Sequence, residues 1–461
     1  MLLTIEKLIY GGDGLARLAA APDTAAASID EDRGRGKAVF VPFVLAGEKI
    51  DATLTEQKSA FARARVDAVI EASPHRIPPP CPHFSRCGGC HYQHASYEHQ
   101  LEIKKEILRE NLRRIAKLDL PFEIEVHPSP PWNYRNRSRF QIRTEQAQVS
   151  PTFAAGYFML ASHELLAVEE CPISSPLINR GLASLWQSGR AGKVPQGVRE
   201  VEFFASADDT QLLVDVACSG QARRAAVRGW AEDLRAAMPA IAGIVAFREP
   251  NPGDRKPGAQ EILVTVGTAH LTYQTQRAAY RVSAGSFFQT NRHLTDELVK
   301  IVTARQSGKL ALDLYAGVGL FSTGLNDFYH VISVETSQTS SSDLSYNQPL
   351  NGEAVQATAE QYLARAENSG QAGKGALISH TLNKPDLVVV DPPRSGLGER
   401  VARSLASLGA PRLIYVSCDP ATLARDLVPL LAAGYRVEQL HLVDLFPQTY
   451  HLESVVHLVR N

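Results

Sequence analysis

The chain has 461 residues, which is too long for one hydrophobic core and predicts about two to four domains. Its 48 basic and 49 acidic side chains give a net charge of −1, so a nucleic-acid-binding surface, if present, must be a local patch. The apolar content of 44% is that of a globular protein, and the absence of a run of roughly 18 apolar residues excludes a membrane-spanning helix.

Residues 1–65 are expected to form a small β-barrel. Strand-like runs at Thr4–Arg17, Ala38–Val44 and Ile50–Thr55 alternate with glycine turns, as in small barrels. The alanine-rich stretch Ala19–Arg33 has no strand periodicity and predicts an inserted loop. The beginning of the chain lacks a basic segment followed by a small-residue cleavage site, so we expect no secretory signal and a cytoplasmic protein.

Residues 66–280 are expected to form an α+β domain. The prolines of His75–Pro82 mark its beginning, and Glu200–Ala205 and Gln211–Ala217 are strand candidates whose pairing the sequence does not give. A helix is expected from Ser96 onward. Its apolar face contains Leu101, Ile107, Leu108, Leu112 and Ile115, and Lys104, Lys105, Arg109 and Arg113 are expected on its other faces.

Four cysteines of the central segment have the pattern of metal ligands: Cys81, Cys87, Cys90 and Cys171. In a reducing compartment such a cluster indicates metal binding rather than disulfides. Four thiolates suit zinc, and a Cys-Pro after a long gap also suits an iron–sulfur cluster, so the spacing leaves both open. It does not match the Cys-x3-Cys-x2-Cys arrangement of radical methyl-donor enzymes. Cys218 has no such neighbours and is expected to pack in a core.

Residues 281–461 are expected to form an α/β domain with a mostly parallel sheet. Short apolar runs are separated by helical lengths, as in sheets covered on both faces. The expected strands are Leu310–Tyr315, Val331–Val334, Leu387–Val390 and Leu413–Val416, with Val443–Phe446 and Val455–Val459 closing the chain.

Two turns of this domain indicate a bound methyl donor. Asp313–Gly319 joins a strand to a helix through glycines, and Glu335 ends the next strand, where a carboxylate commonly accepts hydrogen bonds from ribose hydroxyls. Dinucleotide-dependent oxidoreductases use a similar glycine turn and carboxylate. The third glycine of their motif is missing here, which weakens the case for pyrophosphate binding. Asp391-Pro-Pro-Arg394 resembles a turn of amino-group methyltransferases, with Arg394 in place of an aromatic residue.

Cys418 follows the expected strand Leu413–Val416, at the edge where open α/β sheets bind ligands. A buried, inert cysteine is the alternative. A thiolate at this place suits methylation of a carbon atom such as C5 of uracil, because addition at C6 makes C5 nucleophilic. A base must then remove the C5 proton, and Glu453 is the candidate. An amino-group methyltransferase would not need Cys418.

The chain resembles the S-adenosylmethionine-dependent RNA uracil-C5 methyltransferases, in the branch with a TRAM domain and a [4Fe-4S] cluster. The resemblance rests on these segments: Gly11–Arg17, Gly36–Glu48, Cys81–Cys90, Trp132–Asn136, Phe288–Asn291, Asp313–Gly319, Asp391–Leu397, Val416–Pro420 and Asp444–Glu453. It implies an OB-like TRAM barrel in residues 1–65, an α+β domain with the cluster in 66–280 and a Rossmann-like methyltransferase domain in 281–461.

The resemblance also implies roles for individual residues. Gln289, Tyr315, Glu335 and Asp391 would contact S-adenosylmethionine, Cys418 would be the nucleophile and Glu453 the proton acceptor. Cys81, Cys87, Cys90 and Cys171 would hold the [4Fe-4S] cluster. Phe287 would stack on RNA bases, with a core phenylalanine as the alternative. Ala316 replaces a cysteine found in many members, and the insertion near residues 19–33 is a second departure.

An RNA surface is expected at one basic strand. Arg135, Arg137, Arg139 and Arg143 alternate with Tyr134, Phe140 and Ile142, so the guanidinium groups should share one face and suit phosphate binding. A solvated face is the alternative. We expect a monomer acting on flipped or single-stranded uridine, with large-subunit ribosomal RNA favoured over transfer RNA. A catalytically inactive RNA-binding protein is a further reading, which Cys418 and Glu453 argue against.

Overall fold

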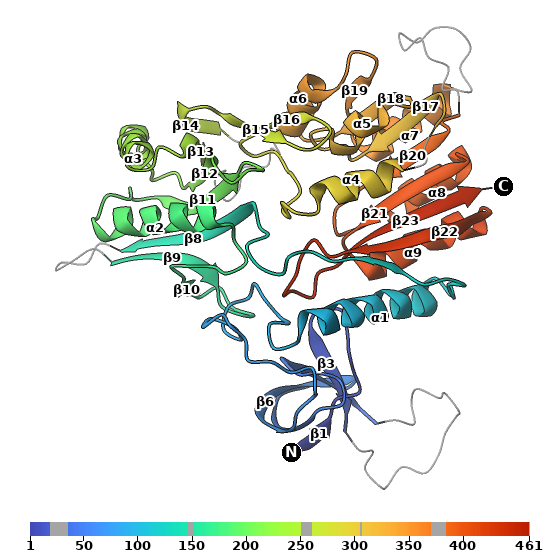
Figure 1. Cartoon of the computed structure of the whole chain (residues 1–461), viewed down its shortest axis with the longest axis horizontal. Helices are drawn as coiled ribbons and strands as arrows, with labels where there is room; N and C mark the ends of the chain where they lie inside the picture. The colour runs from blue at the N-terminus through green and yellow to red at the C-terminus, as the bar shows by residue number, and fades with distance from the viewer. Residues whose placement is uncertain (19–35, 146–151, 250–260, 305–306, 370–383, 461) are drawn as a thin grey trace.

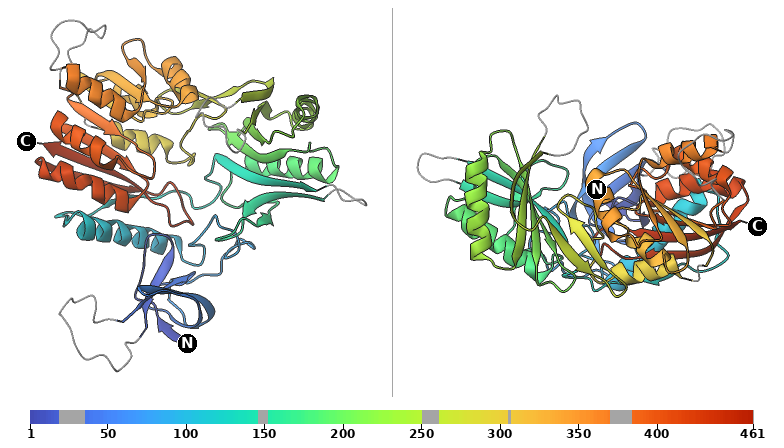
Figure 2. Two further views of the ribbon diagram at one scale, coloured as in Figure 1. Left: turned by 180° about the vertical axis from the view of Figure 1, so that it is seen from behind. Right: turned by 90° about the horizontal axis from the view of Figure 1, so that it is seen from above.

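The computed structural model describes residues 1–18, 36–145, 152–249, 261–304, 307–369 and 384–460. The insertion expected near residues 19–33 lies outside these ranges. Three large sheets occupy three corners of the molecule, as the front and back views both show (Figures 1 and 2). Among the described helices, none has the length and apolar character needed to cross a membrane.

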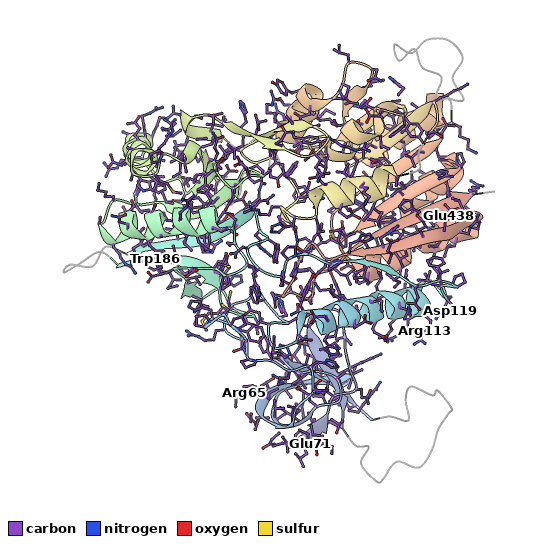
Figure 3. The ribbon with its side chains drawn as sticks, viewed as in Figure 1. Arg65, Glu71, Arg113, Asp119, Trp186 and Glu438 are labelled. Atoms are coloured by element: carbon purple, nitrogen blue, oxygen red, sulfur yellow. The ribbon has the colours of Figure 1, made fainter. Side chains whose placement is uncertain are left out.

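The first sheet has the strand order β1-β5-β6-β4-β3-β2. Its strands are β1 (Leu2–Thr4), β2 (Lys7–Leu8), β3 (Asp13–Arg17), β4 (Ala38–Pro42), β5 (Lys49–Gln57) and β6 (Phe61–Glu71). Small buried side chains such as Ala16, Val39, Val41 and Ala62 form its core. Figure 3 shows Arg65 and Glu71 on β6, a strand that continues past the expected boundary at residue 65. Closure into a barrel stays a prediction.

The second sheet forms the central part of the chain, with the order β10-β9-β8-β11-β12-β13-β14. Its elements are β8 (Arg137–Glu145), β9 (Thr152–Phe158), β10 (Leu165–Ala167), α2 (Pro176–Arg190), β11 (Val198–Ala205), β12 (Leu212–Cys218), α3 (Arg224–Ala237), β13 (Ile241–Arg248) and β14 (Glu261–Gly267). The two strand candidates of the sequence are β11 and β12. Cys218 is fully buried in the core between this sheet and its two helices, as expected for a packing residue.

The third sheet has the order β19-β18-β17-β20-β21-β23-β22-β7. Its strands are β7 (Glu125–His127), β17 (Leu310–Leu314), β18 (His330–Glu335), β19 (Glu353–Gln356), β20 (Leu387–Val390), β21 (Arg412–Ser417), β22 (Tyr435–Val443) and β23 (Glu453–Arg460). The sheet is mostly parallel, but β23 lies antiparallel between β21 and β22. The expected strand Val443–Phe446 is wrong, because β22 ends at Val443.

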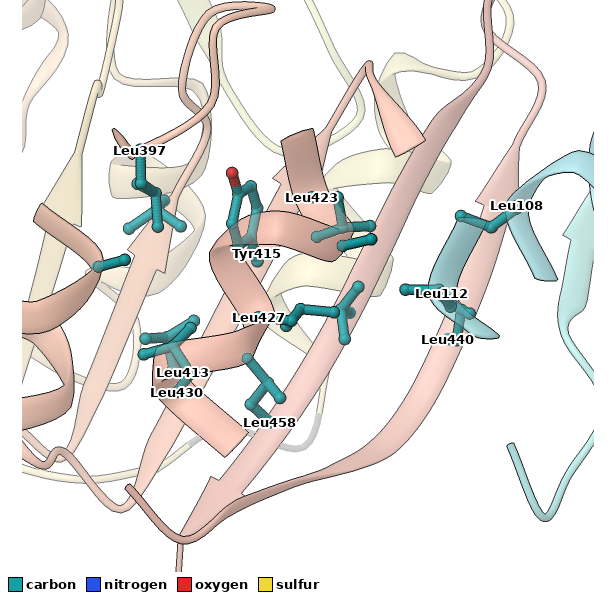
Figure 4. Close-up of a cluster of buried hydrophobic side chains, with 14 of the residues drawn as sticks. Leu108, Leu112, Leu397, Leu413, Tyr415, Leu423, Leu427, Leu430, Leu440 and Leu458 are labelled. Carbon is teal, nitrogen blue, oxygen red and sulfur yellow. The ribbon is translucent and has the colours of Figure 1, made fainter. Parts of the chain in front are cut away.

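Helices cover both faces of this sheet. They are α4 (Thr295–Thr303), α5 (Leu320–Leu325), α6 (Gln338–Asn347), α7 (Ala359–Ser369), α8 (Gly398–Leu408) and α9 (Pro420–Ala432), and the hairpin β15 (His270–Gln274) and β16 (Ala279–Ser283) packs with α4 and α5. Figure 4 shows Leu423, Leu427 and Leu430 of α9 against Leu413 and Leu458 of the sheet.

The expected central segment also contributes to this third sheet. Helix α1 (Tyr97–Ile115) places Leu108 and Leu112 beside Leu440 of β22 (Figure 4), and β7 adds the edge strand. The amphipathic pattern predicted the helix but not its partner. One expectation for α1 is wrong: Lys104 is fully buried and forms an ion pair with Asp444. A lysine on a helix surface is ordinarily exposed, so only the buried acidic partner, far along the sequence, explains this position.

Candidate active site and cysteine site

The carboxyl ends of four parallel strands meet at one edge of the third sheet. Because β18, β17, β20 and β21 are neighbours in this order and run parallel, the residues that follow them lie side by side. The strand ends supply Tyr315, Glu335, Asp391 and Cys418, four of the residues singled out from the sequence. The structure thus gathers three of the four expected donor residues and the expected nucleophile at one edge.

The glycine turn after β17 has the backbone geometry of a ligand-binding loop. Tyr315 has a φ of 64°, a left-handed conformation that a bulky residue adopts only where its surroundings impose it. Gly317 and Gly319 also have positive φ, and a Cβ on Gly319 would lie 2.9 Å from Leu344. The Gly317 N–H donates to Glu335 Oε2 at 2.9 Å, which holds this carboxylate beside the turn. Gln289 is buried, and its backbone oxygen accepts a hydrogen bond from Asn136.

Two carboxyls lie at this edge, the fully buried Asp313 and the partly buried Asp391. Burial raises the pKa of Asp313 to about 7, although Ser322 donates to it at 2.5 Å. Burial also raises the pKa of Asp391 to about 7, and the nearby charge of Asp313 adds to the rise. A positively charged ligand would stabilise the ionised form of Asp391 and oppose this effect. The site is therefore suited electrostatically to a cation.

Strand pairing brings Cys418 and Glu453 together. The antiparallel ladder between β21 and β23 ends at the pair of Ser417 and Ser454, so Cys418 and Glu453 are the residues that directly adjoin its last pair. Asp419 caps α9 by accepting hydrogen bonds from the N–H groups of Ala421 and Thr422, which fixes the chain immediately after Cys418. The sequence placed Cys418 at a strand end, and the antiparallel course of β23 places the start of that strand, Glu453, beside it.

The nucleophile candidate and the base candidate share one electrostatic environment. Burial raises the pKa of Cys418 to about 12, and Glu453 and Asp391 add to this rise, whereas Arg394 lowers it. Burial and the charge of Asp391 raise the pKa of Glu453 well above its usual range. Glu453 Oε1 is buried and has no hydrogen-bond partner among the described residues. A carboxyl in this environment is a strong proton acceptor once it is ionised.

Sequence reasoning missed two residues of this site, Tyr10 and His451. The Tyr10 hydroxyl, from the first sheet, donates to the backbone oxygen of Cys418 at 3.1 Å. Arg394 lies 3.3 Å from His451 Nε2, and because arginine only donates, the proton of this imidazole is on Nδ1. Burial and Arg394 lower the pKa of His451 to about 3, so it is neutral. Local sequence patterns carry no signal for contacts between segments so far apart.

The loop between β22 and β23 is held by α1. Lys104 Nζ donates to Asp444 Oδ1 at 2.5 Å and to the Phe446 oxygen at 2.9 Å. Gln100 exchanges two hydrogen bonds with Gln448, each 3.0 Å long, one of them from the backbone N–H of Gln448. This loop leads directly to Glu453, so these contacts fix the approach of the base candidate to Cys418.

The four central cysteines line one cavity of about 110 Å³, together with Arg135, Tyr157 and other residues. Burial raises the pKa of Cys87 to about 11 and that of Cys90 to about 12, and in both cases the neighbouring Cys171 contributes. None of the cysteines forms a disulfide in the described part of the chain. Four converging thiols without disulfides fit a metal centre with four thiolate ligands, whose positive charge would deprotonate them.

The cysteine cavity touches the loop that leads to Glu453. The backbone N–H groups of His91 and Tyr92, directly after Cys90, donate to the Gln448 oxygen at 2.8 and 3.0 Å. Tyr134 packs against Cys171 and donates from its hydroxyl to the Pro447 oxygen at 3.0 Å. The loop between β22 and β23, residues 444–452, is called the catalytic loop below because it leads to the base candidate. It shares a continuous network of contacts with the cysteine site.

The expected basic row for RNA is different in the structure. Arg135 precedes β8 and lines the cysteine cavity, so its assignment to an exposed row is wrong. Arg137 and Arg139 both form ion pairs with Glu202, and Arg137 also donates to the Ser286 oxygen. Glu202 belongs to β11, which lies beside β8, so its carboxylate offsets the positive charge of both arginines. RNA contacts of Arg137 and Arg139 stay a prediction.

Phe287 lies on the surface rather than in a core. Its exposed fraction is 61%, whereas the adjacent Phe288 is 2% exposed and packs with Tyr273. The alternative of a core phenylalanine is thus wrong for Phe287. An exposed ring next to Gln289, one of the donor-site candidates, is available to stack on a base.

The chain is similar to known proteins. Residues 96–461 match the family described as tRNA (uracil-5-)-methyltransferase. An uncharacterized RNA methyltransferase of Aquifex aeolicus is 33% identical over 99% of this chain and 97% of its own. The 23S rRNA (uracil(1939)-C(5))-methyltransferase RlmD of Pseudomonas fluorescens is 31% identical over 98% and 90%. The Pyrococcus abyssi tRNA (uracil-54, C5)-methyltransferase, solved with S-adenosyl-L-homocysteine, shares the fold, with a TM-score of 0.70, 22% identity and full coverage of both chains.

Proposed function

The chain belongs to the tRNA (uracil-5-)-methyltransferase family and is an RNA methyltransferase, and we propose that it methylates C5 of a uridine through a covalent adduct with Cys418. The juxtaposition of Cys418 and Glu453 at the end of the β21–β23 ladder carries this proposal, because it supplies a nucleophile beside a base, and the charge of Glu453 acts on the thiol. An amino-group methyltransferase would need neither. An inactive RNA-binding protein has no use for this arrangement.

The reaction uses Cys418 first and Glu453 last. The Cys418 thiolate adds to C6 of uracil, and the electrons of the C5–C6 double bond move to the O4 enolate. C5 then forms a bond to the donor methyl group, and the bond between that methyl and the donor sulfur breaks. Glu453 removes the proton from C5, the double bond forms again and the Cys418 thiolate leaves. The products are 5-methyluridine and the demethylated donor, and Glu453 releases the C5 proton to solvent before the next cycle.

S-adenosylmethionine is the methyl donor in this proposal, and its sulfonium supplies both the methyl group and a positive charge. Tyr315 and Gln289 would line its binding place, and Glu335 would accept hydrogen bonds from its ribose. Asp391, between β20 and the nucleophile, would face the cationic part of the donor. A positive charge there lowers the pKa of both Cys418 and Glu453, which favours the thiolate and the ionised base.

The cysteine site would hold a [4Fe-4S] cluster bound by Cys81, Cys87, Cys90 and Cys171. Their convergence on one cavity supports four-thiolate ligation. Arg135 lies against the same thiols and would offset part of their negative charge. The contacts from His91 and Tyr134 to the catalytic loop support a structural role, in which the cluster fixes the position of that loop.

The RNA substrate that we propose is 23S ribosomal RNA, because the Pseudomonas fluorescens relative named for that substrate covers nearly the whole chain. The first sheet, which we take as a TRAM barrel, would contribute to RNA binding while Tyr10 contacts the catalytic strand end. A transfer RNA uridine is the alternative. Mass spectrometry of 5-methyluridine in both RNAs, from cells with and without the gene, tests this: loss only from 23S rRNA supports it, and loss only from transfer RNA contradicts it.

A further inference from the structure

Three potential metal ligands meet at the edge of the third sheet, away from the cysteines. Glu125 and His127 belong to β7 and, two residues apart, share one face of that strand. The neighbouring strand β22 places His441 opposite Glu125. One ligand atom from each of the three residues lies within 4.8 Å of the other two. The cluster joins a segment near residue 125 to the strand that precedes the catalytic loop.

The distances between these atoms match a tetrahedral metal site. His127 Nε2 lies 3.1 Å from His441 Nδ1 and 3.6 Å from Glu125 Oε1, and His441 Nδ1 lies 3.3 Å from Glu125 Oε2. With metal–ligand bonds of about 2.0–2.1 Å, the edges of a zinc tetrahedron are about 3.3 Å long. A single ion could therefore contact all three side chains with little movement.

A fourth residue orients the cluster. Glu297 of α4 lies 3.2 Å from His127 Nδ1, the ring nitrogen that faces away from His441. A proton on Nδ1, shared with this carboxylate, leaves the lone pair of Nε2 for a metal ion. Carboxylates behind ligating histidines play this part in many zinc sites.

The two histidines of the cluster are largely shielded from solvent. The His441 side chain is 9% exposed and the His127 side chain is 12% exposed. His457 lies beside His441 with a ring distance of 5.4 Å. The Glu125 side chain is 65% exposed, so an ion has access from solvent and room for water as a fourth ligand.

We propose that Glu125, His127 and His441 bind one zinc-class divalent ion that fastens β7 to β22. The N–H of Asp444 donates to the His127 oxygen at 3.0 Å, so the ion would stabilise the point from which the catalytic loop departs. This site is distinct from the cysteine cavity in ligand type and place. The competing explanation is a hydrogen-bonded histidine pair without metal.

Cobalt(II) chloride titrated into the full-length protein separates these explanations. The cysteine site is kept filled by its own metal, so that added cobalt reports on nitrogen and oxygen ligands through weak visible bands in difference spectra. We expect such bands in the wild type, and we expect them to be lost in His441→Gln and in Glu125→Gln. His270→Gln, which alters an exposed histidine of β15, is the matched control and should keep the bands.

Zinc competition gives the affinity. Glu297→Gln should weaken zinc binding by roughly 10–100-fold, the cost of losing a carboxylate behind a ligating histidine. Glu125 is exposed, so Glu125→Gln should fold even if His441→Gln does not. Equal cobalt spectra and equal zinc affinity in the wild type, Glu125→Gln and Glu297→Gln would overturn the proposal and leave a histidine pair held by hydrogen bonds.

Discussion

Lys104 and Asp444 form an ion pair in which neither side chain is exposed, and the Tyr97 hydroxyl donates to the other oxygen of Asp444 at 2.9 Å. Removal of Lys104 leaves a buried carboxylate without its cation, so we expect Lys104→Ala to lower the free energy of unfolding by about 3–5 kcal/mol. Chemical denaturation measures this. Arg113→Ala, an exposed position of the same helix (Figure 3), should change stability by less than about 0.5 kcal/mol.

The same ion pair should also affect methylation activity, because Lys104 holds the loop that precedes Glu453. Because Lys104 also donates to the Phe446 oxygen, its loss should loosen the loop that leads to Glu453. Equal stability of Lys104→Ala and Arg113→Ala would show that the ion pair contributes nothing.

Glu453→Gln removes the proposed proton acceptor while keeping the size of the side chain. We expect methylation to fall by roughly 10²–10⁴-fold, the usual contribution of a general base. Addition of Cys418 and methyl transfer do not need this base, so a methylated protein–RNA adduct should accumulate on denaturing gels. Glu438→Gln on β22 (Figure 3) is the matched control and should retain full activity. Normal turnover by Glu453→Gln would assign proton removal to another group.

Donor binding should depend on pH through Asp391. The pKa of this carboxyl is raised to about 7, and a cationic donor prefers the ionised form. Affinity for S-adenosylmethionine should therefore be constant above pH 7 and fall by up to about tenfold per unit as pH decreases below 7. Isothermal titration calorimetry from pH 5.5 to 8 measures the slope. Asp391→Asn should bind weakly with a flat profile, and an unchanged slope in this variant would refute the assignment.

The cysteine site should contain iron. Anaerobically purified protein should be brown with roughly four irons per chain, as four thiolate ligands imply. Cys171→Ser should lose most of this iron, whereas Cys218→Ser, at a buried cysteine outside the cavity, should keep it. Iron analysis and visible absorption test both variants. One zinc ion per wild-type chain in place of iron would contradict the prediction.

Local patterns of the sequence predict much of the third sheet. Apolar runs mark β17, β20 and β21, and the residues that follow parallel strands must meet at one edge, which brings Asp391 and Cys418 together. The expected strand Val455–Val459 lies within β23, which begins two residues earlier, at Glu453. Its contact with Cys418 depends on the antiparallel insertion of β23, which periodicity does not reveal.

The remaining features depend on long-range pairing. Lys104 has the pattern of a surface lysine, and only Asp444 explains its burial. Arg135 continues the alternation of β8, yet it precedes the strand and lies among the cysteines. Tyr10 contacts Cys418 across 408 residues of sequence. Such contacts are set by the packing of whole elements, so no local property of these residues predicts them.

The nucleophilic role of Cys418 is tested most directly by RNA that contains 5-fluorouridine. Fluorine at C5 cannot leave as a proton does, so the adduct should be trapped after methyl transfer. Mass spectrometry of the digested complex should find the methylated fluorouridine attached to the peptide that contains Cys418, and Cys418→Ala should give no complex. A complex of equal yield with Cys418→Ala, or attachment at another residue, would contradict the mechanism.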